Sequence, residues 1–348
     1  MSGGGEFQRH WRYVAGLSAR ADDVNRLFDR FVLAAIATIL AVRAFLWLTG
    51  YPQIGGKGLH IAHMLWGGLL MLAALILMQS IITRWARHWG ALIGGVGFGL
   101  FIDEVGKFVT QDNDYFYRPT FAIIYVLFVL LYLVTRALLR GGVLTPHEAL
   151  VNSIEYLKEG ALMEMDADNK ERALALAKAA DPANPFTAPV QGLLESVEAL
   201  PPREAYFWER WAAWFRGKYL ALMNRPSFRS LLVAIFLGAA LIDLIEYRAR
   251  LPELLRDPNA LSFSDKMGIG SGLASSLFVL IGGLQLLRRR RLLAYRFFEK
   301  ALLISLLINQ VFVFVRVQLL GILDLVLVLF LLSALRYMIR QEERAAAA

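Results

Sequence analysis

The sequence contains no cysteine, and only 19% of its 348 residues are charged. The lack of cysteine excludes disulfides, thiolate metal sites, cysteine nucleophiles and thioether-linked haem. The charge content is low for a soluble domain, in which roughly a quarter of the residues are charged. The scarce charges separate apolar runs of about 18 residues or more, which are long enough to cross a bilayer. This pattern excludes an ordinary cytosolic enzyme, a disordered protein and a secreted disulfide scaffold.

Eight apolar segments predict an all-α polytopic membrane protein. They cover residues 31–50, 59–82, 89–109, 119–139, 230–247, 267–287, 293–315 and 317–338. Each segment should be helical, because backbone groups surrounded by lipid must form hydrogen bonds within their own segment. A 30-residue polar stretch precedes the first segment, so we expect that segment to be a signal anchor and not a cleaved signal peptide.

The distribution of lysine and arginine predicts the orientation of the chain. Loops on one side of the eight spans carry 27 of these residues, and loops on the other side carry seven. The positive-inside rule then places the protein in the cell inner membrane with both termini in the cytoplasm. The run Arg288–Arg291 is the strongest single determinant, with a lipid-headgroup site as the alternative. The net charge of +8 therefore reports orientation, and we expect the lipid bilayer and no nucleic acid as a partner.

The two halves of the chain align with each other. Residues 100–105 (LFIDEV) match residues 306–311 (LLINQV). This predicts two parallel four-helix repeats, at 31–139 and 229–340, related by an axis along the membrane normal. The acids Asp103 and Glu104 correspond to the amides Asn309 and Gln310, so ionisable chemistry is expected in the first repeat.

The remaining segments are an N-terminal segment (1–30), a helical cytoplasmic insert (140–228) and a C-terminal tail (341–348). Thr145-Pro146-His147-Glu148 has the pattern of a capping box and predicts a helix to about Met165. Two further helices are expected from Asp168 to Asp181 and from Thr187 to Leu200.

The pairing of helices in the insert resembles a single helical-hairpin repeat of the tetratricopeptide kind, over about 35 residues. Residues 145–200 carry a net charge of −6. One such unit cannot bury its apolar face alone, so it must pack on the membrane domain, on a cytoplasmic partner or on a second copy. The aromatic-rich segment 203–224 is predicted to lie as an amphipathic helix in the headgroup region, with a protein-docking helix as the alternative.

Charged and polar residues inside the spans are the functional candidates, because such groups are expensive in lipid. The candidates for a substrate or proton site are Arg43, His60, His63, Asp103, Glu104, Lys107, Asn309 and Gln310. With the predicted orientation they lie at one depth, which indicates a hydrated pocket that opens toward the periplasmic side.

The spacing of these residues suggests specific contacts. Asp103 and Lys107 can face each other on one helix. Glu104 points about 100° away from Asp103 and can meet His60, His63 or Arg43 on other spans. A divalent metal site would need His60, His63 and a carboxylate such as Glu104. Packing or interfacial histidines and proton transfer are the alternatives, and no nucleotide or haem motif is present.

Four glycines, at positions 94, 95, 97 and 99, precede the acidic pair. They lack the lysine and hydroxyl residue of a phosphate-binding loop and instead predict close helix packing, with Gly67 and Gly68 as the matching surface.

The leading functional hypothesis is proton-coupled binding or translocation of a small solute or ion. The alternatives are a membrane-embedded enzyme that acts, with or without a metal, on a lipid or lipid-linked substrate at the outer leaflet, and a scaffold or sensor that signals through the insert.

Overall fold

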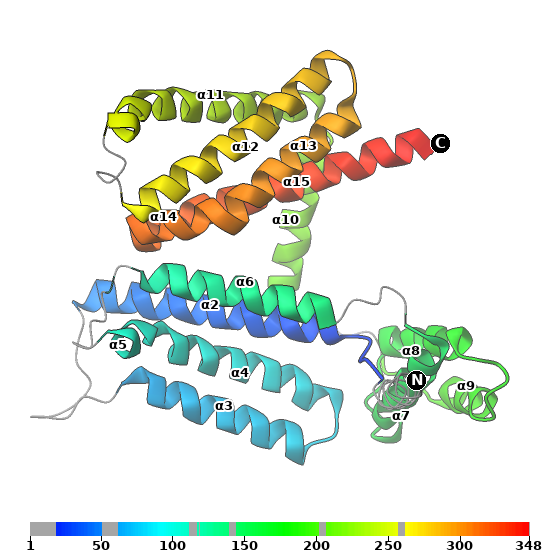
Figure 1. Ribbon diagram of the computed structural model, residues 1–348. Coiled ribbons are helices and arrows are strands. Elements are labelled where there is room, and N and C mark those ends of the chain that lie inside the picture. Colours follow the sequence, from blue (N-terminus) through cyan, green and yellow to red (C-terminus); the bar gives the residue numbers. More distant parts are fainter. Residues whose placement is uncertain are drawn as a thin grey trace, which may run out of the picture. The chain divides into compact units, whose positions relative to one another are not determined.

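The computed structural model describes residues 19–50, 62–110, 117, 119–138, 144–201, 207–256 and 262–347. Its helices are α2 (Val24–Thr49), α3 (His63–Ser80), α4 (Arg84–Asp103), α5 (Val105–Val109), α6 (Thr120–Leu138), α7 (Pro146–Ala161), α8 (Ala167–Ala179), α9 (Thr187–Ser196), α10 (Phe207–Met223), α11 (Pro226–Arg256), α12 (Phe263–Leu287), α13 (Arg291–Ile304), α14 (Gln310–Val317) and α15 (Gly321–Ala347) (Figure 1). A π-helical turn and a 3₁₀ turn flank α14. The described residues contain no strand, so the all-α prediction is confirmed.

Several helices are long and apolar enough to cross a membrane. Five pass on length and composition, and a sixth passes if the bent pair α10–α11 is one span. Their outer faces are apolar: α3 buries only Gly67 and Ala74 and exposes leucines along its length. Such a large exposed apolar surface suits lipid. The chain therefore has the character of a membrane-spanning protein, but eight spans are not confirmed.

The last candidate span, Arg291–Ala346, is a helical hairpin and not one straight rod. The chain turns at Gln318, whose φ of 50° lies in the left-handed region. Two ion pairs connect the arms, Arg336–Glu299 at 2.8 Å and Arg296–Glu343 at 3.0 Å. From the first ion pair to the second, the residue number rises on α15 and falls on α13, so α13 and α15 are antiparallel. The predicted span at 89–109 is also interrupted, because α4 ends at Asp103.

The chain divides into two compact units. The first unit comprises Met1–Val105 and Tyr132–Glu204, and the second comprises Gly106–Leu131 and Ala205–Ala348. This division does not follow the predicted repeat boundaries, because most of the insert clusters with α2, α3 and α4.

In the first unit, glycines let α4 approach two helices at backbone distance. A Cβ atom at Gly97 would lie 2.7 Å from the carbonyl oxygen of Gly67 on α3. On the side facing α2, a Cβ atom at Gly99 would lie 2.6 Å from the carbonyl oxygen of Ala35, and Gly95 abuts Phe31 in the same way. The prediction of close packing is confirmed for Gly67, whereas a Cβ atom at Gly68 would meet nothing within 4 Å.

The insert folds as three short helices around a small core. Thr145 and Glu148 form the predicted capping box at the start of α7. Asp166 caps α8 by accepting a hydrogen bond from the Asn169 amide at 2.7 Å. The core contains Leu150, Tyr156, Met165, Ala173, Ala177, Ala180, Val190 and Leu194.

The insert docks on the starts of α2 and α4 through a network of charged side chains. Arg84 donates to Asp22 at 3.1 Å and to Asp23 at 2.9 Å, and its guanidinium lies 3.9 Å from the ring centre of Tyr156. The hydroxyl of Tyr156 on α7 donates to Asp22 at 3.0 Å, and Arg172 on α8 donates to the same carboxylate at 2.6 Å. The sequence allowed the insert to pack on the membrane domain, on a cytoplasmic partner or on a second copy. These contacts show that it packs on α2 and α4 of its own chain.

A second contact joins the insert to the segment before α2. Arg20 donates to both carboxylate oxygens of Glu148, at 2.6 and 2.9 Å. Asn152 accepts from the amide of Asp22 at 2.9 Å and donates to the carbonyl of Arg20 at 2.7 Å. The hydrogen bond from Arg20 lowers the pKa of Glu148 to about 2, although burial opposes this shift.

The second unit is organised around an aromatic core. Phe236 on α11 stacks on Phe298 on α13, with ring centres 5.3 Å apart. Leucines from α15 complete this core. The π-helical turn Ser305–Asn309 lies between α13 and α14. Tyr125 on α6 donates a hydrogen bond to the Leu306 carbonyl in this turn.

Replacing Gly97 by alanine should destabilise the first unit by about 1–3 kcal/mol, because the added methyl group collides with backbone atoms of α3. Thermal unfolding of the purified protein in detergent measures this effect. Gly68→Ala is the matched control, since it adds the same atom where nothing lies within 4 Å. Equal melting temperatures for the two variants would contradict the backbone contact.

Docking of the insert should weaken as the pH falls. The contribution of Glu148 is fully present above its usual pKa of 4.5 and is lost as the pH falls toward 2, because the pKa is depressed in the folded state. Glu148→Gln keeps the cap but loses the charge, so it should lower stability at pH 7 by about 1–2 kcal/mol and flatten this part of the pH profile. Thermal unfolding as a function of pH tests this, with the exposed Glu171→Gln as control. A profile for Glu148→Gln that matches the wild type would exclude the contribution.

Candidate functional site

Four of the candidate residues meet at the end of the α2–α3–α4 bundle that lies opposite the insert (Figure 1). Arg43 lies in the last two turns of α2, His63 is the first residue of α3, and Asp103 is the last residue of α4. Glu104 follows directly. The close glycine contacts along α4 bring these three helix ends within hydrogen-bonding reach of one another.

Asp103 forms a buried ion pair with Arg43. The Arg43 Nε atom donates to the carboxylate at 2.6 Å, and its Nη2 atom donates to the backbone carbonyl of Asp103 at 2.9 Å. One guanidinium therefore neutralises the acid and also satisfies a carbonyl at the end of α4. The contact with the carbonyl is favourable, because the last carbonyl groups of a helix lack partners within the helix and attract positive charge.

The end of α4 separates the two acids. Glu104 leaves the helix with φ −89° and ψ 7°, and α5 begins at Val105. Asp103 and Lys107 therefore do not belong to one continuous helix, contrary to the basis of the predicted i,i+4 pair. Glu104 contacts His63, one of the three partners that the sequence allowed, but Asp103 contacts the same imidazole ring, so the two acids converge on it.

His63 lies between the two carboxylates. Its Nε2 atom is 3.2 Å from Asp103, and its Nδ1 atom is 3.0 Å from Glu104. A neutral imidazole has only one N–H group, whereas both of these nitrogens face an acceptor. The two contacts can both be hydrogen bonds only if His63 is an imidazolium or if one carboxyl group carries the proton. His63 thus connects the two acids through both of its ring nitrogens.

The site is buried but has one side that is accessible. Asp103 and Glu104 are fully buried and Arg43 is 7% exposed, whereas the His63 side chain is 23% exposed. His63 is therefore the member of the cluster that reaches the surface. The formal charges of Arg43, Asp103 and Glu104 sum to −1, and a protonated His63 would bring the sum of the four side chains to zero.

The geometry does not supply a metal site among the described residues. Both ring nitrogens of His63 face carboxylates, and Asp103 already pairs with Arg43. No group of three or more histidine, aspartate or glutamate side chains in the described part of the chain could hold a metal ion. His60, the other imidazole of the predicted metal site, lies outside the described residues.

The other candidates belong to the second unit. Lys107 lies on α5, and Asn309 is the last residue of the π-helical turn. Gln310 is fully buried and donates a hydrogen bond to the Gly321 carbonyl at 2.9 Å. This bond connects α14 to the start of α15, so Gln310 has a structural contact of its own.

A second charge cluster was not predicted from the sequence. Asp23 is buried beside Arg84 and lies 3.2 Å from His88, at the end of the bundle where the insert docks. Burial would raise the pKa of Asp23, but the His88 hydrogen bond and the charges of Arg84 and Arg87 hold it well below its usual range. The sequence signal was the pair Asp22-Asp23 directly before an apolar run, with arginines at the start of another.

No protein-family model, curated protein or solved structure matches the chain.

Arg43→Ala should destabilise the protein by roughly 3–5 kcal/mol, because Asp103 would remain buried without its guanidinium. Replacing both residues by leucine should cost less than the single change, because the buried acid is removed as well. Thermal unfolding in detergent measures both variants. Arg30→Ala, an exposed position on the same helix, is the control, and an effect of Arg43→Ala no larger than that of Arg30→Ala would disprove the buried pair.

Proposed function

We propose that the chain is a multi-pass inner-membrane protein that binds and translocates a small cation or a cationic solute in exchange for a proton. The contact of His63 with both carboxylates is the observation that supports this proposal most directly. Arg43 holds one acid through a hydrogen bond of 2.6 Å, so in this proposal the exchanged proton is carried by His63 and the remaining carboxylate oxygens. Loss of this proton creates the negative charge that a cation would compensate.

The chemistry favours a monovalent cation or an amine as the solute. Deprotonation changes the charge of the site by one, from zero to −1. A monovalent cation restores neutrality, whereas a divalent cation would leave an excess positive charge in a buried site. An anion would have to displace a carboxylate from Arg43, which donates two hydrogen bonds to Asp103.

The proposal includes eight spans arranged as two parallel repeats. Both aligned regions depart from regular α-helix at the same place: α4 ends at Asp103, and the second half has its π-helical turn at Ser305–Asn309. Such departures are frequent at functional sites. In this scheme the second copy keeps the irregular backbone while its amides replace the acids.

The orientation remains the one proposed from lysine and arginine, with both termini in the cytoplasm. The Arg43–Asp103 site would then face the periplasm and the insert the cytoplasm. The exposed aromatic side chains of α10, among them Trp211, Trp214 and Phe215, suit a position in the headgroup layer. The 80° bend between α10 and α11 would allow α10 to lie along the membrane surface while α11 crosses it.

Glu104→Gln should abolish proton exchange at the site, because an amide cannot accept the shared proton. Proteoliposomes loaded with a pH-sensitive dye, challenged with gradients of sodium, potassium or methylammonium ions, measure the flux. Glu299→Gln, which alters a half-buried acid paired with Arg336, is the control. Wild-type proton flux through Glu104→Gln would remove Glu104 from the mechanism, and no cation-driven flux through the wild type would overturn the transport proposal.

Sensing is the second candidate, because α2 and α4 each connect the site to the insert. α2 begins beside Asp23 and carries Arg43 near its other end, while α4 begins at Arg84 and ends at Asp103. A change of charge at the site would move the same two helices on which the insert docks. Infrared spectra of the carboxyl groups would separate protonation of the site from any transport.

Hydrogen exchange tests the sensing candidate. Glu104→Gln should alter amide exchange in α7 and α8, because the network of Asp22, Arg84 and Tyr156 lies at the other end of the same helices. Tyr156→Phe, which removes the hydroxyl bond to Asp22 and keeps the ring beneath Arg84, gives the exchange pattern of a weakened dock. Unchanged exchange in Glu104→Gln, with a clear change in Tyr156→Phe, would exclude communication between the ends.

A further inference from the structure

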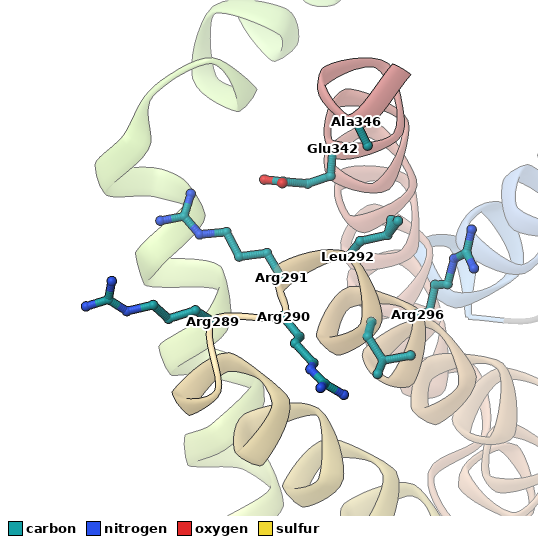
Figure 2. Close-up of a pocket in the computed structure, with 8 residues that line it drawn as sticks. Arg289, Arg290, Arg291, Leu292, Arg296, Glu342 and Ala346 are labelled. Carbon is teal, nitrogen blue, oxygen red and sulfur yellow. The ribbon is translucent and has the colours of Figure 1, made fainter. Parts of the chain in front are cut away.

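A basic hollow of about 440 Å³ lies in the second unit, where the turn between α12 and α13 meets the end of α15. It is lined by Arg289, Arg290, Arg291, Leu292, Leu293, Arg296, Glu342 and Ala346. Figure 2 shows Arg289 and Arg291 extending to one side of the turn, while Arg290 and Arg296 point in other directions. The arginine side chains thus diverge from the turn, with those of Arg289 and Arg291 on the same side of it.

Positive charge is in excess at this hollow. Four arginines face a single lining acid, Glu342. Arg296 pairs with Glu343 at 3.0 Å, whereas Arg289, Arg290 and Arg291 form no ion pair with any other described residue. These guanidinium groups therefore remain available to an anion, with Arg289 and Arg291 on the same side of the turn. They lie beside the N-terminal turn of a 14-residue helix, where the helix dipole also favours negative charge.

The backbone of this turn favours glycine but contains arginine. The Arg289 amide donates to the Leu286 carbonyl, and the Arg290 amide donates to the Gln285 carbonyl, which together form a Schellman motif at the end of α12. Arg289 is the first residue beyond the end of the helix in this motif, and its φ of 60° is a strained conformation for a residue with a side chain. An observed strained residue is a reason to look for a function of its side chain.

We propose that this hollow binds the phosphate group of an anionic phospholipid. Arginine recognises phosphate through paired N–H groups, and a cluster of arginines is the usual setting for such recognition. Leu292, Leu293 and Ala346 supply an apolar wall, which suits the acyl end of a lipid and not a free ion. The hollow lies at the ends of long apolar helices, at the level where headgroups are expected.

The site is separate from the Arg43–Asp103 cluster and does not depend on the proposed transport function. Soluble phosphate shares the same chemistry, so the two sources must be distinguished by experiment. Electrostatic recognition also predicts that binding weakens as the salt concentration rises.

The test is thermal unfolding of the full-length protein in neutral detergent, monitored by tryptophan fluorescence. The probes are dioctanoyl phosphatidylglycerol, dioctanoyl phosphatidylcholine and inorganic phosphate, each over the same concentration range. Phosphatidylglycerol should raise the melting temperature of the wild type, and the other two should have little effect. The apparent affinity for phosphatidylglycerol should fall by about fivefold for each arginine removed.

Arg289→Gly is the decisive variant, because it should raise the melting temperature without lipid while it weakens lipid binding. A merely structural role would change stability alone. Arg290→Ala with Arg291→Ala should weaken binding further, whereas Arg26→Ala with Arg30→Ala removes the same charge from exposed positions of α2 and should leave binding unchanged. Equal losses in the two double variants would overturn the site. An equal shift with inorganic phosphate would overturn the lipid as its source.

Discussion

The approach of α4 to α2 and α3 at backbone distance is the constraint on which the first unit depends. Gly97 meets the backbone of α3, while Gly95 and Gly99 meet that of α2. With larger side chains at these positions the helices would stand farther apart. Arg43 and His63 could not then both reach Asp103, and the buried carboxylates would lack compensation. The charge cluster thus follows from a packing solution made by residues that have no chemistry of their own.

Buried charges at the two ends of the α2–α3–α4 bundle are compensated in different ways. At one end, Arg84 joins Asp22, Asp23 and the ring of Tyr156, so the acids are matched by several donors. At the other end, a single histidine spans two acids and a single arginine fixes one of them. The first arrangement connects the start of α2 to α4 and to the insert, so it suits a permanent dock. The second places two buried acids on one imidazole, and the proposed proton exchange rests on that arrangement.

Local patterns in the sequence predicted much of this arrangement. The capping box at Thr145 and the contact at Gly67 both follow from spacing along one segment. The docking network was missed, because no periodicity connects Asp22 with Arg84 or Arg172 across the chain. The interruption after Asp103 was missed for a related reason: the apolar pattern continues to residue 109, although the helix ends where Arg43 satisfies its final carbonyl. The repeat and the eight spans rest on alignment and hydropathy, which do not specify how the chain turns.

The glycine surface of α4 has a mechanical consequence. Helices that interlock through large side chains must change many rotamers before one can move along the other. A surface of bare backbone has few such obstacles, so fewer side chains would have to change rotamer if α4 moved along its axis. A displacement of this kind would reach both ends of the helix at once, because an α-helix is stiff along its length.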